Sequence, residues 1–150
     1  MQSDGYTMIG KPIEILDRGK ADGPLIEAPN LVYEDNRYLL FFSSNCYSTP
    51  LYDISYATAD SIKGPYTKSA APLLVTGNFS LTSPGGASSD GKGHMVFQYV
   101  LIRALYSTGP WHSQDLLLTN ILSANCPSGK GGRCMFQTDY QFESGIVTIH

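Results

Sequence analysis

The residue with the clearest chemical potential is Glu27, a single carboxylate among apolar neighbours in the stretch GPLIEAPN, residues 23–30. Prolines flank it at positions 24 and 29, so an extended backbone is expected here. A side chain held against Leu25 and Ile26 is partly desolvated, and desolvation disfavours the charged form. This is the condition under which a carboxyl group serves as a general acid near neutral pH. An exposed glutamate on an edge strand is the alternative interpretation.

Other catalytic and metal-binding patterns are missing from the sequence. It contains no G-x-S-x-G, no C-x-x-C and no H-E-x-x-H. The stretch SGKGG, residues 128–132, lacks the spacing of a phosphate-binding loop. His94 follows a DG turn, where a solvated turn residue is a better interpretation than a metal ligand. We therefore expect no metal site.

Composition and charge exclude two classes of partner. The formal net charge is -3 and the basic residues are scattered singly, which argues against a nucleic-acid partner. No apolar run is long enough to cross a membrane, and the N-terminus MQSDGYTMIG has no signal-peptide pattern. The three cysteines are an odd number and cannot form a fully paired framework, although a bridge between Cys126 and Cys134 is possible.

The elements that must position Glu27 are short strands separated by turns. LVYED and RYLLFFSS flank an Asp35-Asn36 turn, LYDISYATA alternates, and HMVFQYV follows a second DG turn. We also expect strands in YTMIG and KPIEIL after an SDG turn, and a pairing of IRALYS with HMVFQYV. This pattern predicts an all-β fold, which could be a sandwich, a barrel or a propeller. Two comparable blocks about 50 residues apart favour propeller blades.

The character of the sequence changes from residue 108 onward. This part does not continue the rhythm of hairpins. We expect a β domain over residues 1–107 and an irregular tail over residues 108–150. The tail is predicted to contain a short helix at 114–122 and one edge strand in GIVTIH.

Three motifs give the sequence a family resemblance. IEAP, YLLFFSS and YDISYATADSIKGPY occur in this order, followed by SPGGASSDGKGHMVF and RALYS. Together they resemble glycoside hydrolase family 43, the arabinan- and xylan-degrading five-bladed β-propellers. The resemblance covers residues 3–107. It implies a partial propeller of about two blades and part of a third.

The resemblance implies a role for Glu27, which stands at the glutamate of the family's E-(G/A)-P motif and would be the general acid of an inverting hydrolysis. Such a reaction also needs a carboxylate base and, in this family, an aspartate that tunes the acid. Both belong to earlier blades, and no aspartate of this chain matches them. We therefore expect a catalytically incomplete form, with a partner chain as one source of the missing blades.

The resemblance also implies substrate contacts and surroundings. Arg103 stands where the family often has a sugar-binding arginine, and Asn45 and Tyr47 follow the strand after the acid, near the pocket. A surface arginine and a packing tyrosine are the alternatives. No cofactor is required, and the calcium ion of some relatives lacks support, because this chain has Gly86 and Gln98 where they carry histidines.

Carbohydrate is the expected substrate, and relatives are usually extracellular. Two functional alternatives remain at this point. One is a non-catalytic carbohydrate-binding or assembly fragment, and the other is a remnant without function.

Overall fold

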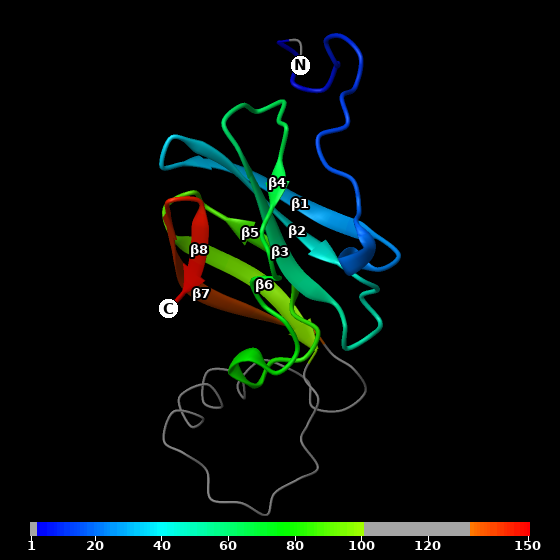
Figure 1. The fold of residues 1–150 in the computed structure, drawn as a ribbon, viewed down its shortest axis with the longest axis vertical. Coiled ribbons are helices and arrows are strands. Elements are labelled where there is room, and N and C mark those ends of the chain that lie inside the picture. Colours follow the sequence, from blue (N-terminus) through cyan, green and yellow to red (C-terminus); the bar gives the residue numbers. More distant parts are fainter. Residues whose placement is uncertain (1–2, 101–132) are drawn as a thin grey trace, which may run out of the picture.

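The computed structural model describes residues 3–100 and 133–150, and these residues form two antiparallel four-stranded sheets (Figure 1). The first sheet contains β1 (Ile26–Glu34), β2 (Arg37–Ser44), β3 (Asp53–Ala59) and β4 (Thr67–Lys68) in that order. The second contains β5 (Gly85–Ser89), β6 (His94–Val100), β7 (Arg133–Glu143) and β8 (Ile146–Ile149), also in chain order. Of two 3-10 helices, η1 (Lys20–Asp22) precedes β1 and η2 (Asn78–Ser80) lies between β4 and β5.

The predicted hairpin at residues 35 and 36 is confirmed. Asp35 and Asn36 have φ angles of 49° and 57°, so both central turn residues are left-handed. Such a turn matches the right-handed twist of the flanking strands, and Asn and Asp tolerate it better than most residues. It sets the register that places Glu27 opposite Ser43 at the far end of β1 and β2.

The two sheets pack face to face around one core. Alternate residues of β2 and β3 contact alternate residues of β6 and β7, as the period of a strand requires. The largest fully buried members include Phe41, Ile54, Met95 and Phe97. β5 lies beside β1 and β2, so the first strands of both sheets run next to each other. This arrangement is that of two consecutive propeller blades.

The strands expected near the N-terminus do not form. Residues 3–19 contain no strand, and Tyr6, Met8 and Ile9 are between 67% and 81% exposed. A strand needs a hydrogen-bonded neighbour, and the described part of the chain provides none beside this segment. In Figure 1 the segment extends away from the sheets as a blue trace.

The second sheet corrects the sequence prediction for the C-terminal part. Residues 133–149 form β7 and β8, so the expected irregular tail does not extend to them, while the strand expected in GIVTIH is confirmed as β8. β7 pairs with β6 from Val100 opposite Arg133 to His94 opposite Asp139. The predicted pairing of IRALYS with HMVFQYV lies outside the described residues, while β5 and β7 are the two neighbours of β6 within them. The helix predicted at 114–122 lies outside the described residues.

Candidate functional site

Glu27 lies at the start of β1, next to an irregularity in the strand. The pairing with β2 shifts by one residue between Glu27 and Asn30, and Ala28 within this bulge has a φ of 52°. The backbone is therefore extended at Glu27 but left-handed immediately after it. The Glu27 side chain is exposed, so the predicted burial against Leu25 and Ile26 is wrong. The bulge re-aims the side chain instead of covering it.

The direct partner of Glu27 is Tyr52. The Tyr52 hydroxyl donates a 2.7 Å hydrogen bond to Glu27 Oε1, across 25 residues of sequence. The Tyr52 side chain is only 1% exposed, and burial, together with the negative charge of Glu27, raises the pKa of its phenol. A neutral phenol donor therefore faces the carboxylate throughout the physiological range.

Residues of the second sheet enclose the Tyr52 ring. A Cβ atom added to Gly85 would lie 1.9 Å from Tyr52 Cε1, so only glycine allows β5 to approach so closely. The next amide, Gly86 N, donates a 2.7 Å hydrogen bond to Ser43 Oγ, opposite Glu27. The site is thus built at the junction of the two sheets.

Arg133 reaches the same junction from the first position of β7. Its Cζ lies 5.4 Å from the centre of the Tyr47 ring and 5.8 Å from that of the Tyr52 ring. Its Nη2 donates a 2.7 Å hydrogen bond to the Tyr47 carbonyl. Cation–π contacts of this kind hold a guanidinium in place and leave further N–H groups available to a ligand.

An open pocket adjoins this cluster. Its volume is about 310 Å³, and its lining combines the Arg133 guanidinium and the half-exposed Tyr47 with the hydroxyl-bearing Ser48, Thr49 and Ser83. Rings with hydroxyl and guanidinium donors suit a polyhydroxylated ligand. The predicted site residue Tyr47 therefore lies at this pocket.

Asn45 has a structural role in the described chain. It adopts a left-handed φ of 63°, and its amide donates to the Asp22 carbonyl at 2.8 Å. Its side-chain Nδ2 donates to Asp53 Oδ2 at 3.1 Å. These bonds fix the start of the loop that carries Tyr47 and Tyr52. The contact between Asn45 and a substrate remains a prediction.

The described residues provide no second carboxylate for Glu27. Asp53 is buried and accepts hydrogen bonds from Ser44, Asn45 and Ser55. Asp22 is buried and forms an ion pair with Lys68. Within residues 3–100 and 133–150, no group of three or more His, Cys, Asp or Glu residues could hold a metal ion.

A free thiol lies close to the same cluster. Cys46 is partly buried, and its Sγ is 3.1 Å from Ser48 Oγ. This hydrogen bond lowers the pKa of Cys46, while the nearby charge of Glu27 acts in the opposite direction. The charge of Glu27 therefore acts on the Cys46 thiol, but the hydrogen bond with Ser48 has the larger effect on its pKa.

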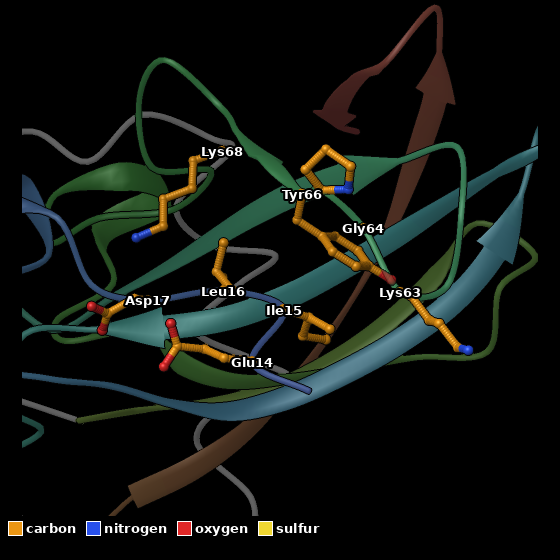
Figure 2. A pocket seen from close by; sticks show the side chains of 9 residues that line it. Glu14, Ile15, Leu16, Asp17, Lys63, Gly64, Tyr66 and Lys68 are labelled. Carbon is orange, nitrogen blue, oxygen red and sulfur yellow. The ribbon is translucent and has the colours of Figure 1, made fainter. Parts of the chain in front are cut away.

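A larger groove of about 540 Å³ lies elsewhere and does not include Glu27. Figure 2 shows Glu14 and Asp17 of the N-terminal segment on one side of it, and Tyr66 and Lys68 on the other. Its residues mix both charges and share no member with the Tyr52 cluster. We assign the candidate site to Glu27, because the Tyr52 hydroxyl binds its carboxyl group and the Arg133 guanidinium lies over the same tyrosine ring.

Sequence reasoning located part of this site. Glu27 and Tyr47 are connected by two other residues: Tyr52 binds Glu27, and Arg133 contacts the rings of both Tyr47 and Tyr52. Arg103 lies outside the described residues. Tyr52 and Arg133 were missed. Tyr52 opens the alternating YDISYATA stretch, which predicted a strand but no site residue, and Arg133 fell within the predicted tail. The alternation of RCMFQTDYQFE was the one signal that could have found the strand that carries Arg133.

No helix within the described ranges is long and apolar enough to cross a membrane. No protein-family model matches the chain, and no curated protein matches it.

Solved structures do match. The crystal structure of a thermostable family-43 glycoside hydrolase has a TM-score of 0.70 and 24% identity, over 99% of this chain and 45% of that chain. The GH43 endo-arabinanase from Bacillus licheniformis has a TM-score of 0.62 and 22% identity, over 97% of this chain and 46% of that chain. The Bacillus subtilis arabinanase Arb43A has a TM-score of 0.65 and 19% identity, over 99% of this chain and 46% of that chain.

The chain spans less than half the length of these solved structures. Its two sheets confirm the predicted all-β, partial-propeller fold. The chain therefore has the fold of part of a family-43 glycoside hydrolase.

Proposed function

We propose that this chain is the part of a glycoside hydrolase that supplies the general acid, in a protein that hydrolyses arabinan- or xylan-type glycosidic bonds with inversion. The observation that carries the proposal is the placement of Glu27. Its carboxyl group is exposed, one oxygen is bound by Tyr52, and the other is open to a ligand. The names of the matching structures, which include arabinanases, support the substrate class.

In this mechanism Glu27 protonates the glycosidic oxygen while a carboxylate base activates water on the opposite face of the sugar. Inverting enzymes keep the two carboxyl groups about 6.5–9.5 Å apart to admit that water. Asp22 and Asp53 are engaged in buried contacts, so we assign the base to another part of the complete protein or to a partner chain. Arg133 and Tyr47 would contact sugar hydroxyl groups, and no cofactor is needed.

A non-catalytic carbohydrate-binding fragment is the second candidate. It is favoured by the lack of a base carboxylate beside Glu27 among the described residues. In that case the chain binds arabino- or xylo-oligosaccharides without cleaving them. Relatives are usually secreted, so either activity would operate outside the cell.

The test compares two kinds of substrate with the wild-type chain and its Glu27→Gln variant. A nitrophenyl glycoside has a leaving group that needs little protonation, whereas an oligosaccharide needs a general acid. We expect Glu27→Gln to lower oligosaccharide hydrolysis by about 10²–10⁴-fold and to affect the nitrophenyl substrate much less. Glu14→Gln, at an exposed carboxylate of the other groove, serves as the control.

An equal loss on both substrates would contradict the acid role. If the folded wild-type chain binds oligosaccharides but cleaves neither substrate, the assay is repeated with the remaining blades supplied as a second chain. Binding that stays without cleavage would favour the non-catalytic candidate.

A further inference from the structure

We propose that Tyr52 is the positioning residue of the general acid: its hydroxyl occupies Glu27 Oε1 and thereby leaves Oε2 as the oxygen that carries the transferable proton. This inference rests on the proposed function. It adds Tyr52 to the residues of the site and states that Tyr52 donates the hydrogen bond to Glu27. It also makes the position of the acid depend on how the two sheets pack.

The first argument is that Tyr52 cannot move away from Glu27. The ring is almost completely buried, with 1% of the side chain exposed. Gly85 closes one side, where an added Cβ would overlap the ring at 1.9 Å. Arg133 lies over the ring at 5.8 Å. The Tyr52 hydroxyl is therefore held in one position, whereas the exposed Glu27 side chain can adopt several rotamers. The hydrogen bond from Tyr52 selects one of them.

The second argument is the direction of the hydrogen bonds. Gly86 N is a backbone amide and can only donate, so Ser43 Oγ must accept at 2.7 Å. The Ser43 hydroxyl keeps its own proton, and its proximity to Tyr52 lowers the pKa of the phenol. Tyr52 in turn donates to Glu27 Oε1 at 2.7 Å. The backbone amide donates to Ser43 and the phenol donates to Glu27, so Glu27 Oε1 is the accepting oxygen.

The chemical consequence follows from this order. Because Oε1 accepts, the proton of a neutral Glu27 carboxyl resides on Oε2. In the transfer step the Oε2–H bond breaks, an O–H bond forms on the glycosidic oxygen, and Glu27 becomes a carboxylate. Hydrogen bonds to a charged acceptor are about twice as strong as neutral ones, so the bond from Tyr52 strengthens as the charge develops. Tyr52 therefore stabilises the transition state more than the bound substrate.

The structural test observes Glu27 without any turnover. The protein is labelled with ¹³C at glutamate carboxyl carbons, and the Glu27 resonance is assigned by its loss in Glu27→Gln. We expect Tyr52→Phe to shift this resonance, since Phe keeps the ring and removes the donor. Tyr33 is an exposed tyrosine of β1, the strand that carries Glu27, and Tyr33→Phe should leave the Glu27 resonance unchanged. An unchanged Glu27 resonance in a folded Tyr52→Phe variant would overturn the proposal.

The kinetic test applies to the form of the protein that hydrolyses oligosaccharides. We expect Tyr52→Phe to lower kcat by about tenfold or more, as for loss of a hydrogen bond to a charged group, with little change in KM. A lowered kcat with an unchanged KM separates loss of the transition-state contact from loss of substrate binding. An unchanged kcat would refute the positioning role.

The two tests separate the inference from the proposed function. If the carboxyl resonance shifts in Tyr52→Phe and no form of the protein hydrolyses a glycoside, the hydrogen bond is upheld and the proposed function fails. If hydrolysis depends on Glu27 but the resonance does not respond to Tyr52, the proposed function is upheld and the inference fails. Ser43→Ala gives a second variant, expected to shift the resonance less than Tyr52→Phe.

Discussion

At the scale of single residues, the conformation of Ala28 explains how an apolar-looking stretch presents a carboxylate to solvent. A φ of 52° is uncommon for a residue with a side chain, and a small side chain limits its cost. The sequence predicted Glu27 through its motif, but it could not predict Tyr52 as its partner. The two residues are 25 positions apart, and only the register of β1 on β2 and the turn into β3 bring them together.

A second residue-scale consequence concerns Cys46. The hydrogen bond with Ser48 lowers the pKa of this thiol, so its thiolate forms at lower pH than that of an ordinary cysteine. We expect alkylation of Cys46 by iodoacetamide to show a pH midpoint below the usual value. Ser48→Ala should move the midpoint upward. Mass spectrometry of the peptide that contains Cys46 measures the rate, and identical midpoints in the two proteins would contradict the assignment.

At the scale of elements, the two sheets are joined at the end opposite Glu27 by Tyr140 of β7. Its hydroxyl donates to Glu34 Oε2 at 2.6 Å and lies 2.6 Å from Ser89 Oγ, which connects β7 with β1 and β5. Burial and the charge of Glu34 raise the pKa of Tyr140 to about 12. The phenol is therefore neutral in the folded state at pH values where a free tyrosine ionises.

This contact predicts a pH-dependent stability. The folded-state pKa of Tyr140 is raised, so its stabilisation is complete below the ordinary value near 10 and is lost as the pH rises toward about 12. Tyr140→Phe should cost about 1–2 kcal/mol at neutral pH and should lose less additional stability between pH 10 and 12. Urea unfolding at several pH values measures both effects. A Tyr140→Phe variant with the wild-type alkaline decline would contradict the prediction.

The accuracy of the sequence prediction also differs between elements. β1, β2 and β3 were predictable because turn residues such as Asp35 and Asn36 bound apolar strands of ordinary length. β7 was harder to predict, because its alternation is imperfect, with Thr138 at an inward position and Met135 exposed, and its partner β6 ends at residue 100. Pairing between strands so far apart in the chain leaves no local signal.

At the scale of the whole molecule, the N-terminal segment has sequence suited to strands but no neighbour to pair with among residues 3–100 and 133–150. We expect amide hydrogens of residues 8–17 to exchange much faster than those of β2 and β3, because local stability follows burial and strand pairing. Hydrogen exchange followed by mass spectrometry measures the difference. Protection of residues 8–17 equal to that of β3 would contradict this picture, while protection gained when other blades are added would support assembly.

The pairing of Val100 with Arg133 has a consequence for protein engineering. These two residues close the ladder between β6 and β7, while residues 101–132 connect them along the chain. Arg133 also contacts Tyr47 and faces Tyr52. A ligand-responsive domain joined to the chain between Val100 and Arg133 would act on the side chain that faces Tyr52, the partner of Glu27, which makes this pair the natural position for a biosensor.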